Sequence, residues 1–548
     1  MIVLKESDLY KKVAQLLVVR ASGYALDSQR QFPQWELNNS ELKQLLEEGI
    51  GGVILFGGTT FELQNRTKTI RSWAHQPIFL CADVEEGLGQ RFEGGTWLVP
   101  PLAVGQIYRN DPKKATAIAE NYGACIGVQA RECGLNWVLA PVCDINNNSN
   151  NPVINLRAWG EDPLTVADLV SAFNKGLSSQ GVLTCAKHFP GHGDTSVDSH
   201  LALPIIEHDL NRLKELELVP FEAVIASGVE TLMTAHILFP NIDSKAPATL
   251  SAQILTKLLR EEIGFDGLLV TDALVMDAIR TSYGDEEAVV MAFEAGADLL
   301  MMPVNPKKAI HAICNALLSG RIPMTRLEES LHRRQNALDK LTTFDSTVCG
   351  QAHKFDCQFI ERKEDKDFAE DLLLRSIKIR SKVINGNIDR DINLVRIDGL
   401  FPCQFLTNHS PAFLLAEEAG YKTTLCHQMG VSPWQDDAEN PLALDRFGDG
   451  SFLLQLFIRG NPFRGSLFKK EPWLATIRQL QRLNRLSGVI LYGSPFFWND
   501  INQVLEKSIP CAYSPGQMND AQKHVLLSLL QTQQDKQTTT LQFQEFTD

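Results

Sequence analysis

Short apolar runs alternate with longer amphipathic stretches from about residue 15 to residue 302. Runs such as Gly52–Phe56 are apolar at consecutive positions, which is typical of parallel strands buried on both faces. Stretches such as Asp285–Ala295 have the 3.6-residue period of amphipathic helices. The predicted strands are Gln15–Ala21, Gly52–Phe56, Pro77–Cys81, Trp137–Val142, Val182–Ala186, Leu232–Ala235, Leu268–Thr271 and Asp298–Met302. These eight strand–helix units predict a (β/α)8 barrel of the TIM type rather than an open doubly wound sheet.

The remaining sequence predicts a second, smaller α/β domain. A chain of 548 residues is too long for one ordinary hydrophobic core. The predicted organisation is a barrel at 1–345, a linker at 346–362, an α/β sandwich at 363–530 and a disordered polar tail at 531–548. Within the sandwich, the pattern predicts helices at 367–380, 473–484 and 520–530, and strands at 452–458, 488–492 and 509–513.

Charge and cysteine usage limit the possible partners. The net charge of −14 argues against nucleic acid or an anionic membrane as the partner, because both require a basic surface. The 11 cysteines are odd in number and scattered, and several lie in apolar runs, which predicts buried thiols in a reducing compartment. The first residues do not have the pattern of a secretion signal, and no apolar stretch is long enough to cross a membrane. We therefore expect a cytoplasmic protein.

The segment Lys187–His200, KHFPGHGDTSVDSH, contains three histidines, two aspartates and a lysine, which is an unusual density of titratable groups just past the end of a strand. It directly follows a predicted buried strand, and in parallel barrels catalytic residues lie at that position. Asp198 and His200 are two residues apart, so a carboxylate could orient the imidazole of a general acid/base. Two alternatives remain open: a zinc site formed by His188, His192 and Asp194, or a polar loop without chemistry.

Further polar residues follow the other predicted strands and should converge on the same rim of the barrel. The third predicted strand is followed by Asp83 and the fourth by Asp144. The sixth is followed by His236 and the seventh by Asp272. A carboxylate at the end of the seventh strand is a candidate nucleophile. The alternative is that Asp272 caps a following helix.

Four motifs together resemble glycoside hydrolase family 3. KHFPGHGDTSVDSH is similar to the signature of its β-N-acetylglucosaminidase branch, which is marked by the Asp-x-His ending. The sequence TDALVM resembles the nucleophile motif S-D-D-L-x-M, and NLRAWGEDP resembles N-x-R-[SA]-F-G-x-D-P. The sequence DVEEGLGQRF resembles D-Q-E-G-G-R-V-x-R-[FL], from which it departs at Glu86 and Leu88. The later segment GVILYGSPFFWN resembles part of the C-terminal domain of two-domain members.

The resemblance implies an exo-acting, retaining β-N-acetylglucosaminidase that needs no metal or cofactor. Asp272 would be the nucleophile, and His200 the acid/base oriented by Asp198. The residues implied to bind the terminal sugar are Asp83, Arg91, Arg157, Lys187 and His188. The implied partners are carbohydrates, namely peptidoglycan-derived muropeptides recycled in a bacterial cytoplasm. The second domain would not be needed for the chemistry, because the acid/base lies in the barrel.

Other activities fit the same residues. A β-N-acetylglucosaminide phosphorylase would use the same site, since a histidine acid/base tolerates an anionic phosphate. A β-glucosidase is a further alternative. The departures at Glu86 and Leu88 leave open a sugar-binding protein without catalytic activity.

Overall fold

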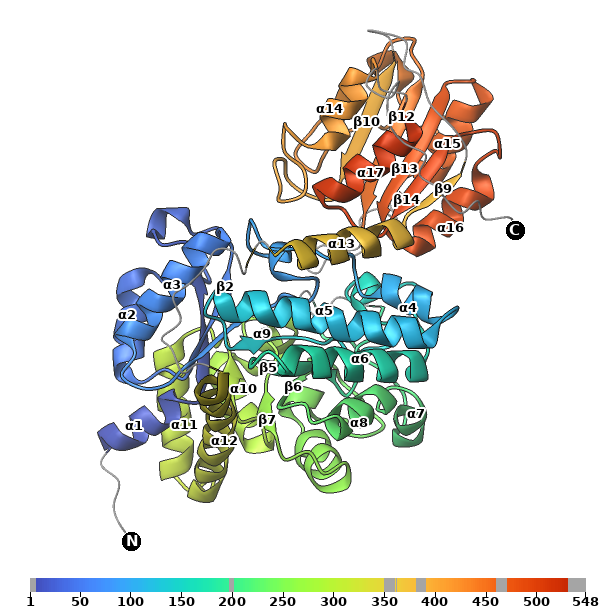
Figure 1. The fold of residues 1–548 in the computed structure, drawn as a ribbon. Coiled ribbons are helices and arrows are strands. Elements are labelled where there is room, and N and C mark those ends of the chain that lie inside the picture. The colour runs from blue at the N-terminus through green and yellow to red at the C-terminus, as the bar shows by residue number, and fades with distance from the viewer. Residues whose placement is uncertain are drawn as a thin grey trace. The chain divides into compact units, whose positions relative to one another are not determined.

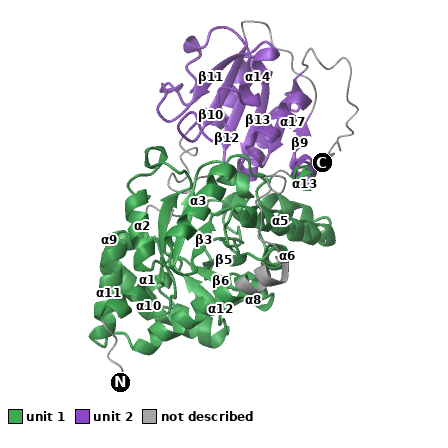
Figure 2. Ribbon diagram, turned by 60° about the vertical axis from the view of Figure 1, so that its left-hand side comes forward, with its two compact units in different colours: residues 1–366 green, residues 367–548 purple. Residues whose placement is uncertain are grey.

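The computed structural model describes residues 6–196, 202–348, 360, 362–380, 391–459 and 471–530. The chain divides into two compact units, residues 1–366 and 367–548 (Figure 2). Asp198 and His200 lie outside the described residues, as do most of the expected linker at 346–362 and the expected tail at 531–548. Their predicted roles therefore stay predictions.

Eight parallel strands form the sheet of unit 1, in the order β7-β6-β5-β4-β3-β2-β1-β8. A bridge between Val270 and Leu299 connects the two ends of this order, so the sheet is nearly closed. The predicted (β/α)8 barrel is confirmed, although several strands are shorter than predicted. The strands are β1 Leu17–Ser22, β2 Gly52–Phe56, β3 Phe79–Ala82, β4 Trp137–Val138, β5 Leu183–Phe189, β6 Thr231–Thr234, β7 Leu268–Val270 and β8 Leu300–Met301.

Helices pack around the outside of this barrel (Figure 1). Local capping explains where several of them begin and end. Asn38 caps α2 in a capping box with Glu41, and Gly49 ends it with a φ of 104°. The helices of unit 1 are α1 Glu6–Ala14, α2 Asn39–Glu48, α3 Thr60–Trp73, α4 Leu102–Tyr108, α5 Pro112–Glu132, α6 Pro163–Ser178, α7 Leu210–Glu215, α8 Val219–Ala226, the π-helix Gln253–Glu262, α9 Asp277–Tyr283, α10 Asp285–Ala295, α11 Pro306–Leu318 and α12 Met324–Val348.

Unit 2 is a three-layer α/β domain. Its sheet has the order β11-β10-β12-β13-β14-β9, and only β9 runs antiparallel to its neighbour. One apolar cluster places α15 and α16 against the sheet, and a second cluster places α14 and α17 against it. The elements are α13 Lys363–Ser376, β9 Lys378–Arg380, β10 Ile392–Ile397, α14 Pro411–Glu418, β11 Lys422–Cys426, β12 Phe452–Ile458, α15 Trp473–Arg482, β13 Leu486–Gly493, α16 Pro495–Val504, β14 Cys511–Ser514 and α17 Asn519–Leu529.

Two helix predictions were wrong in detail. The sequence pattern predicts a single helix over Asp209–Ser227, but this segment forms two helices, because Leu216 leaves helical geometry (φ −130°, ψ −75°) and Pro220 lies in the first turn of α8. The helix expected at 367–380 is α13, which ends at Ser376, and residues 378–380 form the edge strand β9 instead.

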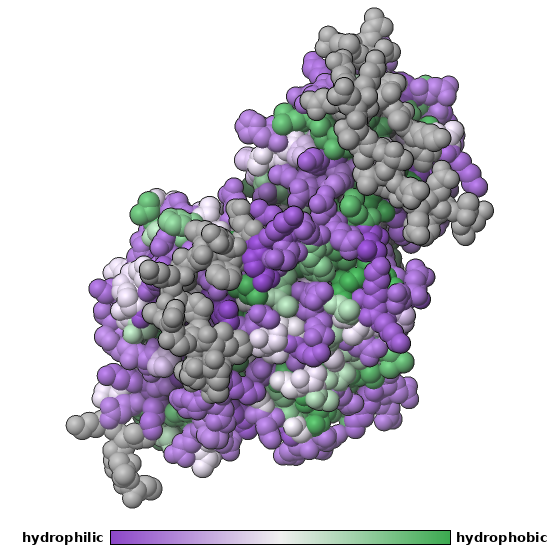
Figure 3. All heavy atoms as spheres, in the orientation of Figure 1, coloured by the Kyte–Doolittle hydropathy of each residue, from purple (hydrophilic) through white to green (hydrophobic). Residues whose placement is uncertain are grey.

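Hydrophilic side chains predominate on the face of the molecule drawn in Figure 3. Within the described part of the chain, no helix combines the length and apolar character of a membrane span.

Candidate active site

The described part of the loop after β5, residues 190–196, lies against the loop that follows β4. Gly193 has no room for a side chain, since a Cβ there would lie 1.7 Å from the carbonyl oxygen of Ile145. Asn151 Nδ2 donates hydrogen bonds to the carbonyl oxygens of His192 and Gly193, each at 2.8 Å. These contacts fix the beginning of the loop that contains the candidate acid/base further along.

Four charged side chains form a network at the carboxyl ends of β3, β4 and β5. Lys187 is buried, and its Nζ lies 2.7 Å from Asp83 Oδ1 and 2.6 Å from Glu85 Oε1. Arg157 donates two hydrogen bonds of 2.8 Å to the two oxygens of Glu85. The structure thus brings together three of the predicted sugar-binding residues and adds Glu85, which sequence analysis did not assign to the site.

The network keeps Glu85 and Lys187 charged although both are buried. Burial would raise the pKa of the Glu85 carboxyl, but the charges of Arg157 and Lys187 outweigh it and hold that pKa well below its usual range. Burial would lower the pKa of Lys187, but Asp83 and Glu85 outweigh it and raise that pKa. Asp83 is the accessible end of the network, with 24% of its side chain exposed. It therefore presents carboxylate oxygens that can accept hydrogen bonds from a ligand.

A second group of contacts surrounds Asp144, which is fully buried. Its carboxylate lies 2.7 Å from His188 Nδ1 and accepts a hydrogen bond of 2.6 Å from the backbone N–H of His192. The ring of His192 contacts Thr195 Oγ1 through Nδ1 at 2.9 Å. Burial and the nearby His188 lower the pKa of His192 to about 4, so this ring is neutral at pH 7. Asp144 orients His188, a role that sequence analysis did not assign to it.

Arg91 is exposed and lies beside the same network. Its Nε donates a hydrogen bond of 3.0 Å to the backbone carbonyl of Asp83, and its guanidinium lies 5.8 Å from the centre of the Phe56 ring. It therefore holds the backbone at Asp83.

Asp272 lies two residues beyond the end of β7, and its side chain is partly exposed. Its Oδ1 accepts a hydrogen bond of 2.7 Å from the backbone N–H of Ala273. The alternative that Asp272 caps a helix is wrong, because the next helix, α9, begins at Asp277 and has Met276 at its N-cap. The charge of Asp272 raises the pKa of His192 and so opposes the effect of burial, which indicates that the two side chains lie near each other.

The side chain of His236 is fully buried next to Asp272. Its Nδ1 lies 2.8 Å from Thr249 Oγ1, and its Nε2 lies 3.2 Å from the carbonyl oxygen of Ala273. Through the second contact His236 supports the backbone of Ala273, the residue that follows Asp272.

The two departures from the sugar-binding motif have local structural partners. The Glu86 carboxylate is buried and accepts a hydrogen bond of 3.2 Å from Trp97 Nε1. Leu88 is fully buried. Both side chains contribute to the packing of the segment that follows β3.

The three residues considered as zinc ligands make separate contacts. His188 bonds to Asp144, His192 to Thr195, and Asp194 Oδ2 to His208 Nε2 at 2.7 Å. Among the described residues, no group of three or more His, Cys, Asp or Glu side chains is arranged to bind a metal ion.

Comparisons with known proteins identify the relatives of this chain. The sequence profile of the Glycosyl hydrolase family 3 N terminal domain matches residues 8–337, and that of the Bacterial Glycosyl hydrolase family 3 C-terminal domain matches residues 384–531. The solved structure of a glycoside hydrolase family 3 β-N-acetylglucosaminidase from Paenibacillus sp. str. FPU-7 is similar, with a TM-score of 0.75 and 26% identity over 95% of this chain and 96% of that chain.

Two curated proteins named beta-hexosaminidases are also similar. Beta-hexosaminidase A of Pseudoalteromonas piscicida is 38% identical over 287 residues, which cover 48% of this chain and 48% of that protein. The match thus spans about half the length of that relative. The beta-hexosaminidase of Stenotrophomonas maltophilia (strain K279a) is 35% identical over 284 residues, which cover 51% of this chain and 84% of that protein. The resemblance found in the motifs is confirmed, and the chain belongs to glycosyl hydrolase family 3.

Proposed function

We propose that the protein is an exo-acting, retaining β-N-acetylglucosaminidase. The observation that carries the proposal is the arrangement on one barrel rim of Asp272 and the network formed by Asp83, Glu85, Arg157 and Lys187. The relatives named above as hexosaminidases and as a β-N-acetylglucosaminidase support the choice of sugar.

Asp272 is assigned as the nucleophile that attacks the anomeric carbon and forms a covalent glycosyl-enzyme. Its partial exposure leaves it accessible to substrate, and the N–H of Ala273 fixes one of its oxygens at 2.7 Å. His200, oriented by Asp198, is assigned as the acid that protonates the leaving oxygen and then as the base that activates water. A histidine in this role adds no negative charge to a site that already contains several carboxylates.

The charged network is assigned to the terminal sugar. Asp83 would accept hydrogen bonds from sugar hydroxyls, while Arg91, Arg157, Lys187 and His188 would donate to them. Paired carboxylates and guanidiniums suit hydroxyl recognition, because they offer both acceptors and forked donors. Glu85 would fix Lys187 and Arg157 in position.

The natural substrates are proposed to be peptidoglycan fragments with a terminal N-acetylglucosamine, processed during wall recycling in a bacterial cytoplasm. The described cysteines are free thiols and most are buried, which fits a reducing compartment.

The test is hydrolysis of a nitrophenyl β-N-acetylglucosaminide by the purified protein. We expect release of N-acetylglucosamine with the β configuration retained, as followed by proton NMR. Added phosphate should not increase the rate or yield a sugar phosphate, as it would for a phosphorylase. A protein that ignores this substrate but hydrolyses β-glucosides well would contradict the sugar assignment, and binding of sugar without turnover would favour the inactive alternative.

A further inference from the structure

A largely buried polar cluster, termed the anchor cluster, connects the end of unit 1 to the segment that follows β3. It consists of Thr96, Gln129, Arg362 and Asp365. Asp365 lies in the first turn of α13 and belongs to unit 1, which ends at Lys366. Gln129 lies in α5, 236 residues away in sequence. Gln129 is fully buried and Asp365 is 3% exposed, so both must find their hydrogen-bond partners within the protein.

The amide of Gln129 bridges two segments of the chain. Its Oε1 accepts a hydrogen bond of 3.0 Å from the backbone N–H of Thr96. Its Nε2 donates hydrogen bonds of 2.7 Å to Thr96 Oγ1 and 3.0 Å to Asp365 Oδ2. Arg362 in turn donates hydrogen bonds of 3.0 and 2.6 Å to the Asp365 carboxylate. Because hydrogen bonds are directional and apolar packing is not, the cluster fixes where Thr96 lies relative to Asp365.

Thr96 supports the turn that carries Arg91. The carbonyl oxygen of Thr96 accepts a hydrogen bond of 2.9 Å from the backbone N–H of Gly89. A Cβ at Gly89 would lie 2.8 Å from the carbonyl carbon of Thr96, so the two backbones are in direct contact. Gly89 belongs to the 3-10 turn Leu88–Gln90, and the N–H of Arg91 donates a hydrogen bond of 3.1 Å to the carbonyl oxygen of Leu88. A shift of Thr96 would therefore move this turn and Arg91 with it.

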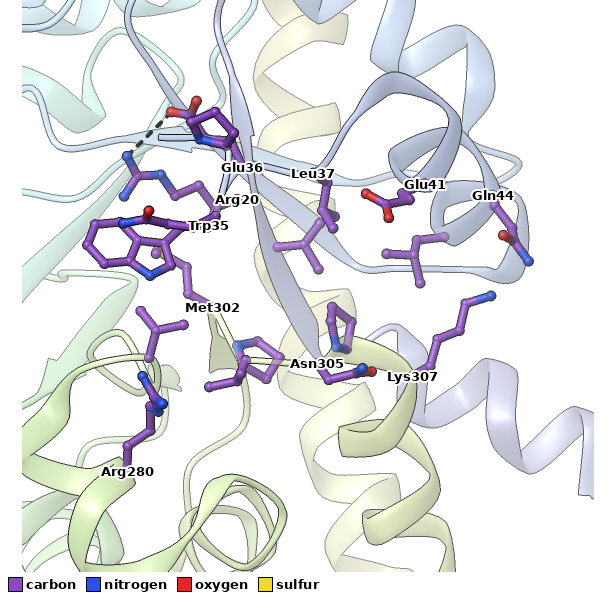
Figure 4. Close-up of a pocket in the computed structure, with 18 residues that line it drawn as sticks. Arg20, Trp35, Glu36, Leu37, Glu41, Gln44, Arg280, Met302, Asn305 and Lys307 are labelled. Atoms are coloured by element: carbon purple, nitrogen blue, oxygen red, sulfur yellow. Dashed lines mark hydrogen bonds and ion pairs between the residues drawn. The ribbon is translucent and has the colours of Figure 1, made fainter. Parts of the chain in front are cut away.

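The side chain of Arg91 has a separate support in the barrel strands. Its guanidinium lies 5.8 Å from the centre of the Phe56 ring at the end of β2. The same ring lies 4.3 Å from the guanidinium of Arg20 in β1. Arg20 lines a pocket of about 490 Å³ and pairs with Glu36 at 3.4 Å (Figure 4). The strands thus hold the guanidinium of Arg91, whereas its backbone rests on the turn that Thr96 supports.

We propose that Asp365 is a positioning residue for the terminal sugar, because it holds the turn of Arg91 in place through Gln129 and Thr96. The inference rests on the proposed function, in which Arg91 binds a sugar hydroxyl. It adds the first turn of α13 to the support of that sugar site. The functional barrel unit then extends to Asp365, beyond residue 345, where the sequence pattern of the barrel ends. An apolar residue at position 365 would leave an N–H of Gln129 buried without its acceptor.

Kinetics of Asp365→Ala with a nitrophenyl β-N-acetylglucosaminide test the inference. KM should rise about 10-fold, which is within the range for coupling through packed networks. The value of kcat should change little, because binding that is equal in the ground state and the transition state affects KM alone. Asp371→Ala is the matched control, since Asp371 is an exposed aspartate of the same helix that pairs with Arg375. Unchanged KM in Asp365→Ala would overturn the inference.

The conservative variant Asp365→Asn separates positioning from stability. Asparagine keeps an oxygen that can accept the hydrogen bond from Gln129 Nε2, but it removes the charge that pairs with Arg362. The melting temperature should therefore fall, whereas KM should stay within about 2-fold of the wild type. If KM rises in both Asp365 variants in proportion to the loss of melting temperature, Asp365 is only structural and the inference fails.

Gln129→Met keeps the inference testable if Asp365→Ala does not fold. Methionine is similar in length to glutamine but removes the hydrogen bonds to Thr96 and Asp365 together. KM should rise at least as much as in Asp365→Ala, and the double variant should show no further rise, because both changes act through the same contacts. A wild-type KM in Gln129→Met, or additive rises in the double variant, would contradict the assignment.

Hydrogen exchange distinguishes failure of this inference from failure of the proposed function. If the wild type turns over no substrate, the glycosidase assignment fails, and exchange alone then decides the inference. The amides of Gly89 and Thr96 should exchange faster in Asp365→Ala than in the wild type and in Asp371→Ala. Mass spectrometry of peptides that span residues 86–98 measures this exchange. Equal exchange in all three proteins would overturn the inference.

Discussion

Two networks of buried charge lie at opposite ends of the barrel in unit 1, and they differ in what they leave accessible. At the amino end of β8, Asp298 is fully buried and contacts Arg260, Arg326 and Arg333 at 2.7, 3.1 and 3.2 Å. Its carboxylate also accepts hydrogen bonds from Ser330 Oγ and the backbone N–H of Leu269. At the carboxyl end, the network of Lys187 finishes at Asp83, which is partly exposed. The first network is saturated by the protein itself, whereas the second presents oxygens to a ligand.

The difference indicates that buried charge at the amino end supports the fold, whereas buried charge at the carboxyl end positions the groups that contact substrate. In both networks burial opposes ionisation, and neighbouring charges outweigh it to lower the pKa of Asp298 and of Glu85. The physics is therefore shared, and only the accessibility of the network differs. Variants at the two ends should separate activity from stability.

The largest expected effect is that of Asp272→Asn on activity. Because the amide cannot act as the nucleophile, turnover of the nitrophenyl substrate should fall to background while the melting temperature stays near that of the wild type. Single-turnover assays and thermal unfolding measure the two properties. A variant that is confirmed by mass spectrometry to be free of deamidation, and that still turns over substrate, would remove Asp272 from its assigned role.

Asp298→Asn should have the opposite profile. Three buried arginine contacts lose their anion, which should lower the free energy of unfolding by about 3–5 kcal/mol, as is usual when one partner of a buried ion pair is removed. The activity per folded molecule should not change. Denaturant unfolding and active-site titration report these quantities. A large loss of activity in the folded fraction would show that the amino-end network also controls the site.

Glu85→Gln probes the network at the other end. Removing this charge leaves Lys187 and Arg157 without their shared anion, and the resulting displacement should lower kcat/KM by about 100-fold. Asp298→Asn is the control, since it also removes a buried carboxylate but lies at the far end of the barrel. If Glu85→Gln lowers stability alone, the two networks do not differ in the way proposed.

The barrel could be predicted from sequence because its strands are buried on both faces and therefore uniformly apolar, as in Gly52–Phe56. The position of Asp83, Lys187 and Asp272 at the carboxyl-end rim could be predicted because they directly follow such runs. Glu85 was not assigned to the site, and Asp144 was placed on the rim without a role, because a buried acidic residue in a loop has the same sequence pattern as an exposed one. Their roles depend on Arg157 and His188, which only the fold brings into contact.

Strand β10 of unit 2 shows a second limit of pattern analysis. It is buried along its length, but its sequence, INLVRI, contains Asn393 and Arg396, which interrupt the apolar run. Asn393 Nδ2 donates a hydrogen bond of 2.9 Å to the carbonyl oxygen of Ala412, and Arg396 Nε donates one of 2.7 Å to the Glu471 carboxylate. Because these partners are distant in sequence, the run did not predict a central strand.

The smallest expected effect concerns pH and His192. The pKa of His192 is lowered from 6.5 to about 4, mainly by burial. Between these two values the unfolded chain binds a proton that the folded protein does not, so this residue makes stability fall as the pH falls from 6.5 to 4. The slope is at most about 1.4 kcal/mol per pH unit. Asp298 should contribute little to it, since its lowered pKa affects stability mainly below the usual aspartate value of 3.8.

The variant His192→Gln isolates this contribution. Burial raises the pKa of the nearby Glu217, which acts in the opposite direction, so the comparison must use the difference between the wild type and the variant. We expect that difference, measured by denaturant unfolding at pH 4.5 and pH 7, to favour the wild type less at the lower pH. The same comparison in the Asp298→Asn background should give the same difference, because the two ends of the barrel titrate independently. A pH-independent difference would show that His192 is not the group that couples protonation to folding at the active-site end.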